Sequence, residues 1–318
     1  MATSDQIKCL IKAHYENNPE QFKTVVLQIA AHEAKLGHEN IAREIKKILE
    51  KSSSNSKIIN ISQTNSLFSM SMPSDSIKQL IVSEDLSIKI SRILKEYINR
   101  KKLSKFGMSN RRKILLEGNP GTGKTFTASV IASELNLPLY TVQMDKLVTK
   151  FMGETSVKLR QIFDSVESIE GVYFFDEFDA IGADRNLDNE VGEMRRILNS
   201  FLQFIENDHS ESIIIAATNN QQLLDQALFR RFDDILHYSL PSTDEIKSIY
   251  KQRICPYQSN FIPTIELIEK SINLSHAEII KVCDDAIKTS ILSDEPIKID
   301  LLLELVYDRI LAYKSKEA

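Results

Sequence analysis

The prediction of the fold rests on one segment, Gly118-Asn119-Pro120-Gly121-Thr122-Gly123-Lys124-Thr125. It matches the pattern G-x-x-x-x-G-K-S/T, in which a glycine-rich loop follows a strand and opens a helix. The residues before it, 113–117, have the apolar character of a buried strand, and residues 126–135 are rich in helix-forming types. The sequence therefore predicts that a strand delivers this loop to the N-terminus of a helix.

The residue types of the loop suit the binding of phosphate groups. Glycines let the backbone approach phosphate oxygens and adopt positive φ angles, so that successive N–H groups form an anion-binding nest at the positive end of the helix dipole. In loops of this pattern the lysine, Lys124, reaches the β- and γ-phosphates of a nucleotide, and the hydroxyl of Thr125 binds Mg²⁺. The residues predicted to bind the nucleotide are Gly118, Asn119, Pro120, Gly121, Thr122, Gly123, Lys124, Thr125 and Phe126.

A second motif places two carboxylates at the end of a strand. The sequence Val172-Tyr173-Phe174-Phe175-Asp176-Glu177 predicts a buried strand that ends in acids, at the carboxyl edge where doubly wound sheets bind ligands. Asp176 is expected to hold the Mg²⁺ shell, whereas Glu177 is expected to polarise the attacking water. An acidic strand end carries little information alone, but it becomes specific when it follows a loop of the first kind.

The composition is that of an ordinary globular protein. The chain has 318 residues, of which 42% are hydrophobic and 26% charged, and its net charge of −4 gives no support for nucleic acid as a partner. The three cysteines, Cys9, Cys255 and Cys283, show no metal-binding spacing and favour a reducing, cytoplasmic setting. The longest apolar runs are too short to span a bilayer, and the first ten residues show no secretory signal.

Changes in pattern divide the chain into four parts. Residues 1–51 predict three short amphipathic helices that form a small helical bundle. Residues 52–73 are rich in serine and predict a linker, within which either Ile58, Ile59 and Ile61 or Leu67-Phe68 are apolar enough to dock on the next domain. Residues 74–241 alternate strands and helices, and residues 242–318 predict only helices, which form a lid.

The alternating part predicts a doubly wound α/β fold with a parallel five-stranded sheet. The expected strands are residues 113–117, 138–143, 171–175, 213–217 and 235–238. The expected helices are residues 85–100, 126–135, 155–168 and 190–205 in this part, and residues 243–254, 263–271, 275–292 and 299–313 in the lid.

Four motifs in this order resemble those of the AAA ATPases, namely the P-loop, Walker B, sensor 1 and the second region of homology. They are residues 118–125, then Phe174-Phe175-Asp176-Glu177-Phe178-Asp179-Ala180-Ile181, then Ala216-Ala217-Thr218-Asn219, then Leu224-Asp225-Gln226-Ala227-Leu228-Phe229-Arg230-Arg231-Phe232-Asp233. The resemblance covers residues 77–292. It implies a homo-oligomeric ring, usually a hexamer, that binds ATP and Mg²⁺ between neighbouring subunits.

The resemblance also implies catalytic roles for polar residues. Asn219 matches sensor 1, which orients the lytic water or contacts the γ-phosphate. Arg230 and Arg231 match the arginine fingers that reach the neighbouring subunit's nucleotide, a task that suits a guanidinium because it stays charged and donates several hydrogen bonds. Many relatives separate these arginines by Pro-Gly, but here they are adjacent. Which of the two contacts phosphate is left open, and one of them is expected to form a structural salt bridge.

Two segments resemble the pore loops with which translocating AAA proteins grip a protein chain. Phe151, Met152 and Gly153 form an aromatic–apolar–Gly sequence between the second strand and the following helix, where an aromatic ring on a mobile loop can hold an extended chain without reading its sequence. The alternative is that Phe151 packs at a subunit interface. Residues 184–193 are acidic and loop-like, and predict either a second pore loop or a solvated surface.

The lid segment Ser275-His276-Ala277-Glu278 resembles a family segment that contacts the nucleotide, so Ala277 joins the predicted nucleotide-binding residues. Ser275 and Glu278 have the spacing of a capping box and predict a helix start. His276 stands where the family has a glycine, so a close backbone approach to the adenine is not predicted there, and a catalytic role for this histidine is not expected. The adenine is also expected to lie against residues 80–86.

The complete set of motifs predicts an ATP-hydrolysing AAA ring that remodels, unfolds or threads a protein substrate. The alternative is a nucleotide-gated oligomeric scaffold that regulates a partner effector such as a protease; the paired arginines disfavour a metabolite kinase. The chain also resembles small bacterial AAA proteins encoded beside subtilisin-like proteases, which makes a peptidase a candidate partner. Neither an HExxH nor a G-x-S-x-G motif is present, so proteolysis is assigned to another chain.

Overall fold

The computed structural model describes residues 25–26, 29–30, 38, 67–147, 152–178, 188–219 and 230–314. The chain separates into two compact units, Met1–Ile61 and Ser62–Ala318. In the first unit, residues 25–26 and 29–30 are helical, and apart from residue 38 the rest of the predicted helical bundle lies outside the described residues. Of the helices in the described ranges, none is both long enough and apolar enough to cross a membrane.

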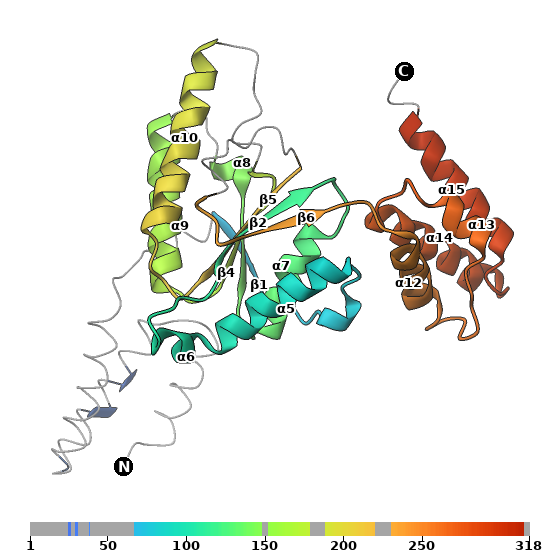
Figure 1. The fold of residues 1–318 in the computed structure, drawn as a ribbon, viewed down its shortest axis with the longest axis horizontal. Helices are drawn as coiled ribbons and strands as arrows, with labels where there is room; N and C mark the ends of the chain where they lie inside the picture. The colour runs from blue at the N-terminus through green and yellow to red at the C-terminus, as the bar shows by residue number, and fades with distance from the viewer. Residues whose placement is uncertain are drawn as a thin grey trace. The chain divides into compact units, whose positions relative to one another are not determined.

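A six-stranded sheet lies at the centre of the described α/β part of the second unit (Figure 1). Its strands are β1 (Phe68–Ser71), β2 (Lys113–Gly118), β3 (Leu139–Val142), β4 (Val172–Phe175), β5 (Ile213–Thr218) and β6 (Asp234–Tyr238). In space they follow the order β1-β3-β4-β5-β2-β6. The strands from β2 to β6 all pair in parallel, which confirms the predicted doubly wound sheet of five parallel strands.

The sixth strand, β1, was not predicted and lies within the segment expected to be a linker. It pairs antiparallel with β3, with Phe68 opposite Val142. The Phe68 ring packs edge-on against Tyr140 and Tyr173, with ring centroids 5.9 and 5.7 Å away, while the other residues of the strand are exposed. Because these contacts come from residues distant in the sequence, the local pattern carries no strand signal.

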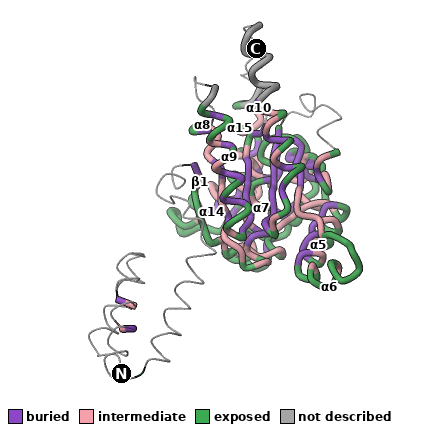
Figure 2. The backbone as a smooth tube through the Cα atoms, turned by 90° about the vertical axis from the view of Figure 1, so that its left-hand side faces the viewer, coloured by how far each residue is buried: buried purple, intermediate pink, exposed green. Residues whose placement is uncertain are grey.

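Two layers of helices cover the sheet. Helices α5 (Glu84–Ile98) and α7 (Lys124–Glu134) pack on one face, and α9 (Met152–Ser168) and α10 (Asp188–Asn207) pack on the other (Figure 1). Figure 2 shows buried segments, in purple, at the centre of this part. All residues of β4 and β5 are buried, and burial on both faces of the sheet explains why these strands are continuous apolar runs. The shorter elements of this part are η1 (Ile77–Gln79), α6 (Arg100–Ser104) and α8 (Met144–Leu147).

The strand order sets the position of the site. β2 lies between β5 and β6, and β4 lies beside β5, so the segments that follow β2, β4 and β5 leave the same edge of the sheet. Ligands bind at this carboxyl edge in doubly wound sheets. The loop 118–125, the acids Asp176 and Glu177, and Asn219 all follow these strands directly.

The described residues of the lid form four helices with their own apolar core. They are α12 (Thr243–Ile254), α13 (Ile265–Lys270), α14 (His276–Ser293) and α15 (Ile299–Lys314), all close to their predicted bounds. The predicted capping box of Ser275 and Glu278 is confirmed at the start of α14. Ile81, which precedes α5, packs against the lid core, so the lid is attached to this segment as well as to β6.

Candidate functional site

Glycines with positive φ shape the loop 118–125. Gly118 (φ 143°) ends β2 beside β6, and a Cβ added to it would lie 2.0 Å from the carbonyl oxygen of Tyr238, so no side chain fits there. A Cβ on Gly121 (φ 74°) would lie 2.7 Å from Ser275 Oγ in the lid. At Gly123 (φ 102°), no heavy atom of the described residues lies within 4 Å of that position. The first two glycines are thus required by close packing, whereas the third faces a space that a ligand can fill.

We expect Gly118→Ala to lower the free energy of unfolding by about 2–4 kcal/mol, because the added Cβ meets the Tyr238 backbone. Urea denaturation followed by circular dichroism measures the change. Gly107→Ala is the matched control, since Gly107 also has a positive φ (72°) but no described atom within 4 Å, and it should lose only about 1–2 kcal/mol. Equal losses in the two variants would contradict the packing argument.

The N-terminus of α7 is open toward the space at Gly123. Gly123 is the N-cap and supplies no side-chain cap, so the first turn keeps its capacity to bind an anion. Behind the loop, the Tyr238 hydroxyl donates to Thr127 Oγ1 (2.7 Å), which donates to the Gly123 carbonyl oxygen (3.0 Å). Burial raises the pKa of Tyr238, which keeps its hydroxyl a donor. This chain of hydrogen bonds fixes the end of the loop to the sheet.

The buried ammonium of Lys124 is held by the loop itself. Its Nζ donates to the carbonyl oxygens of Gly118 (2.7 Å) and Asn119 (2.9 Å), and Thr122 Oγ1 also donates to Asn119 O (2.7 Å). A buried positive charge is costly unless negative groups surround it. The loop therefore concentrates positive charge and N–H donors at one point, as the binding of phosphate requires.

Thr125 and Asp176 meet at the end of the loop. Thr125 Oγ1 donates to Asp176 Oδ2 at 3.0 Å, although the two residues follow different strands. Mg²⁺ is bound by one or two protein oxygens, together with waters and substrate phosphates, in sites that act on nucleotides. Among the described residues, no group of three or more His, Cys, Asp or Glu side chains could hold a metal ion. The paired oxygens of Thr125 and Asp176 thus fit magnesium that takes its other ligands from phosphate and water.

Glu177 and Asn219 lie at the same edge of the sheet. Glu177 has a left-handed backbone (φ 51°), is exposed, and its N–H donates to Asp176 Oδ1 at 3.0 Å. Non-glycine residues adopt this conformation at a cost, and such strain is common at active sites. Asn219 is exposed and follows β5, whose register pairs Phe175 with Ala216. The predicted base and the predicted sensor therefore project from adjacent strands.

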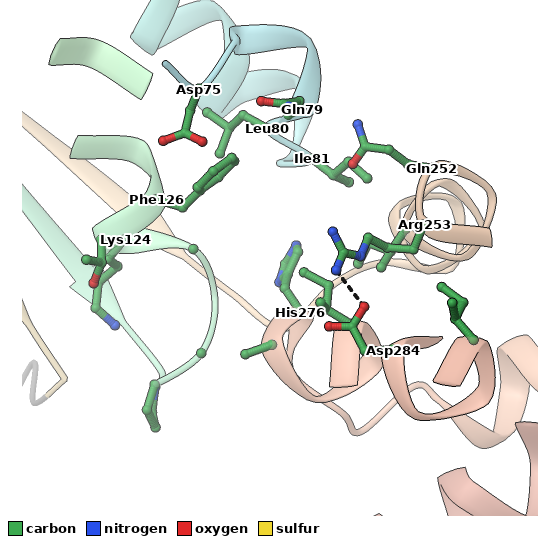
Figure 3. A pocket seen from close by; sticks show the side chains of 18 of the residues that line it. Asp75, Gln79, Leu80, Ile81, Lys124, Phe126, Gln252, Arg253, His276 and Asp284 are labelled. Atoms are coloured by element: carbon green, nitrogen blue, oxygen red, sulfur yellow. Dashed lines mark hydrogen bonds and ion pairs between the residues drawn. The ribbon is translucent and has the colours of Figure 1, made fainter. Parts of the chain in front are cut away.

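A cavity of about 1020 Å³ brings these groups together, and its size suits a nucleotide. The predicted residues in its lining are Pro120, Gly121, Gly123, Lys124, Thr125, Phe126, Asp176, Glu177, Asn219 and Ala277. Gly118, Asn119 and Thr122 shape the loop but are outside this lining. One half of the cavity lies at the loop, and the other lies toward the lid, where Gln252, Arg253, His276 and Asp284 are labelled in Figure 3. We call the second half the apolar half because aliphatic side chains also line it.

The apolar half is formed by three segments that are distant in the sequence. Its aliphatic side chains are those of Leu80, Ile81, Ile249, Ala277, Ile280, Ile287 and Ile291. Residues 80 and 81 belong to the segment expected to flank an adenine. Of the residues that α12 and α14 contribute, Ala277 was predicted. The isoleucines were not, because they follow the same helical period as the lid core. The sequence signal for this apolar surface is weak: these two helices carry more apolar residues than a single stripe facing the lid core requires.

Polar contacts join the lid to the loop and to η1. The N–H of Ala277 donates to the carbonyl oxygen of Gly121 at 2.9 Å, and Gln252 Nε2 donates to Lys78 O at 3.0 Å. Within the lid, Arg253 pairs with Asp284 across the cavity wall at 2.5 Å, as the dashed line in Figure 3 shows. The position of the lid is therefore coupled to the shape of the loop.

Comparison with known proteins identifies the family. A model of the ATPase family associated with various cellular activities (AAA) matches residues 114–240. The uncharacterized AAA family ATPase y4kL of Sinorhizobium fredii is 31% identical to the chain over 301 residues, which are 92% of this chain and 90% of that protein. The chain belongs to the AAA family of ATPases. The resemblance inferred from the four motifs is confirmed.

Other AAA relatives match over a smaller share of their own length. A putative 26S proteasome regulatory subunit homolog of Methanothermobacter thermautotrophicus is 30% identical over 230 residues, or 71% of this chain and 61% of that protein. The ATP-dependent zinc metalloprotease FtsH of Parabacteroides distasonis is 33% identical over 197 residues, or 59% of this chain and 29% of that protein. The chain therefore spans less than two thirds of each of these two relatives.

The two arginines expected from the AAA resemblance have different surroundings. Arg231 Nε lies 3.3 Å from Glu206 Oε2, near the end of α10. Arg230 is exposed, and no hydrogen bond or ion pair joins it to the part of the chain that the structure describes. Neither arginine lines the cavity of its own chain. Among the described residues of the subunit, Arg231 thus has a partner and Arg230 has none.

The predicted pore-loop residues lie at the edge of the described region. Phe151 is outside the described residues, and Met152 and Gly153 form the start of helix α9 and not part of a loop. Of the acidic segment 184–193, residues 184–187 are outside the described residues. Residues 188–193 belong to α10. For residues 190–193 this agrees with the helix expected over 190–205, and the overlapping prediction of a loop over 188–193 was wrong. The amphipathic period of α10 continues upstream into this acidic stretch.

Proposed function

We propose that this AAA protein hydrolyses ATP in a homo-oligomeric ring, a hexamer, and uses the turnover to remodel, unfold or thread a protein substrate. The observation that carries the proposal is the contact of Thr125 with Asp176 beside the exposed Glu177, at the open N-terminus of α7. This contact gathers two magnesium ligands, a candidate base and a phosphate-binding helix end at one edge of the sheet. Membership of the AAA family supports ATP hydrolysis as the reaction.

The cavity accommodates ATP in two parts. The loop N–H groups and Lys124 bind the phosphates, and Lys124 can exchange its carbonyl partners for phosphate oxygens without leaving the loop. Thr125 and Asp176 would hold Mg²⁺, which would neutralise charge on the phosphates. The apolar half holds the base between the segment of Leu80 and the helices of the lid.

Glu177 acts on the attacking water. Its carboxylate is exposed at the cavity, and the hydrogen bond from its N–H to Asp176 fixes its backbone beside the magnesium ligands. Asn219, from the neighbouring strand, supplies an amide that orients the same water. A positioned general base of this kind contributes roughly 10²–10⁴ in rate.

We assign the arginine finger to Arg230, acting on the nucleotide of the next subunit. Arg231 is held by Glu206 of its own chain and positions the segment. Arg230 is exposed and away from its own cavity, which leaves its guanidinium for a neighbour. In a closed ring, each subunit presents one surface to a different surface of the next subunit, so every site can receive one such residue.

A protein is the proposed substrate, and a peptidase in another chain is a proposed partner. Two relatives support this: one is described as a proteasome regulatory subunit homolog and one as an ATP-dependent metalloprotease. We assign the gripping of the substrate to Phe151. We also propose a cytoplasmic location, since Cys255 and Cys283 are free thiols, as a reducing compartment maintains them.

Phe151→Ala is expected to retain ATP hydrolysis within about twofold but to lose remodelling, because an aromatic grip acts on the substrate and not on the nucleotide. The assay follows ATP-dependent loss of fluorescence from a green fluorescent protein with an unstructured tail, with phosphate release measured in parallel. Phe106→Ala is the matched control, because Phe106 is an equally large side chain that is 75% exposed on the loop before β2. Full unfolding activity in Phe151→Ala would remove the threading role.

A further inference from the structure

His276 is a buried histidine of the cavity wall whose ring nitrogens make no hydrogen bond of good geometry with the described residues. Its residue exposure is 8%, and neither ring nitrogen has a partner in the part of the chain that the structure describes. The carboxylate of Glu245 is near, but its Oε2 atom is 3.8 Å from His276 Nε2, beyond hydrogen-bond distance. Buried polar groups in native proteins are nearly always paired, so an unpaired imidazole beside a ligand cavity calls for a ligand.

The other polar side chains on the apolar half of the cavity are already used or face water. Their pairs among the described residues are Asp75 with Ser129 Oγ, Gln79 with the N–H of Ser76, Gln252 with Lys78 O, Arg253 with Asp284, and Lys288 with Asp285. Tyr257 is 65% exposed. Among the described residues, His276 is therefore the buried polar side chain of this half whose ring nitrogens make no hydrogen bond of good geometry, although the Ile81 backbone and the Glu245 carboxylate lie close to the ring.

The chemistry of the ring suits the edge of a purine. Burial lowers the pKa of His276 below its ordinary value, with the Glu245 carboxylate and the Ile81 backbone opposing the effect, so the imidazole is neutral at pH 7. A neutral imidazole has one donor and one acceptor nitrogen. Adenine offers an acceptor nitrogen beside the donor amino group on its exocyclic edge, whereas guanine presents an oxygen acceptor in place of that amino group.

We propose that His276 recognises the base of the bound nucleotide through a hydrogen bond to the purine edge that carries the exocyclic group. The inference rests on the proposed nucleotide function and adds base selection to it. In Figure 3, His276 lies between Phe126 on one side and the Arg253–Asp284 pair of the lid on the other. The next residue, Ala277, also lines the apolar half. Both ring nitrogens are covered in this conformation, so the proposal requires a rotation about χ2, which is a broad torsion in histidine.

The test measures dissociation constants by isothermal titration calorimetry for three ligands in the presence of Mg²⁺. ATP has the complete base, purine riboside 5′-triphosphate lacks the exocyclic amino group, and inorganic tripolyphosphate has no base. The variants are His276→Ala, His276→Gln, which restores a donor and an acceptor, and His209→Ala. His209 is an exposed histidine outside the cavity and serves as the matched control.

We expect His276→Ala to weaken ATP binding about three- to tenfold, the usual effect of losing one hydrogen bond, and to leave tripolyphosphate within about twofold. The wild type should lose a similar factor when the amino group is absent from the ligand. The substitution in the protein and the loss of the amino group from the ligand remove the same hydrogen bond. When both changes are combined, the loss of affinity should therefore be smaller than the sum of the two separate losses. His276→Gln should recover part of the loss, and His209→Ala should bind all three ligands like the wild type.

Two contrary outcomes are distinguishable. A wild-type protein that binds neither ATP nor tripolyphosphate would contradict the proposed function, and base recognition with it. A wild type that binds ATP, while His276→Ala weakens ATP and tripolyphosphate equally or changes neither, would leave the ATPase proposal intact. That result would show that His276 has no role in recognising the base.

Discussion

Glu177→Gln is expected to reduce ATP hydrolysis by roughly 10²–10⁴-fold, because the amide cannot accept a proton from the attacking water. ATP binding should persist, since Glu177 is not among the residues that hold the phosphates or the magnesium. The N–H of residue 177 still donates to Asp176, so the local backbone stays in place. Phosphate release gives the rate, and titration with a fluorescent ATP analogue gives the affinity.

The matched control for this substitution is Glu167→Gln, an exposed carboxylate on α9 that should leave the rate unchanged. Hydrolysis at the wild-type rate in Glu177→Gln would contradict the assignment of the base. The same variant also distinguishes an ATP-driven remodelling protein from a nucleotide-gated scaffold. If Glu177→Gln has lost hydrolysis but still activates its partner effector fully, nucleotide binding alone is sufficient, and the nucleotide-gated scaffold becomes the better account.

Arg230→Ala is expected to lower the ATPase rate by about 10³-fold or more, the range found for arginine fingers that act in trans on phosphoryl transfer. The guanidinium stabilises charge on the transferring phosphoryl group, so the loss should appear mainly in kcat. Arg230 is exposed and bears no ion pair with any described residue, so folding should be unaffected. Thermal unfolding of the variant checks that point.

Arg231→Ala is the companion variant, because it removes the adjacent guanidinium while Arg230 remains. Arg231 contacts Glu206, and Glu206→Ala should therefore reproduce its effect, a loss of less than about tenfold from a displaced segment. A greater loss of kcat in Arg231→Ala than in Arg230→Ala would reverse the assignment of the finger.

The fold could be predicted where local pattern and tertiary structure agree. The strands from β2 to β6 are apolar runs because they are buried on both faces, and the lid helices carry their own caps, such as Ser275 with Glu278. β1 could not be predicted, since a strand of four residues with only Phe68 partly buried is stabilised by Tyr140 and Tyr173 from other segments. Sequence periodicity does not report such contacts.

The same distinction applies to the site. Its phosphate-binding half is predictable because one continuous loop must combine positive φ angles, an ammonium and a hydroxyl, and each requirement limits the residue type. The apolar half, which we propose to bind the base, is assembled from residues 80–81, α12 and α14, and no spacing in the sequence links Ile81 to Ile249 or to Ile280. His276 could be singled out as a departure from a motif, but its unpaired, buried state follows only from three-dimensional packing.

The central claim is that each active site combines residues of two subunits, and mixing two inactive variants tests it most directly. Glu177→Gln retains the finger but lacks the base, whereas Arg230→Ala retains the base but lacks the finger. In mixed rings assembled from equal amounts, about one quarter of the interfaces join an intact base to an intact finger. We predict that the mixture recovers up to about one quarter of the wild-type ATPase rate per subunit. A mixture that stays as inactive as its separate components, although both variants bind ATP and assemble together, would contradict the shared site.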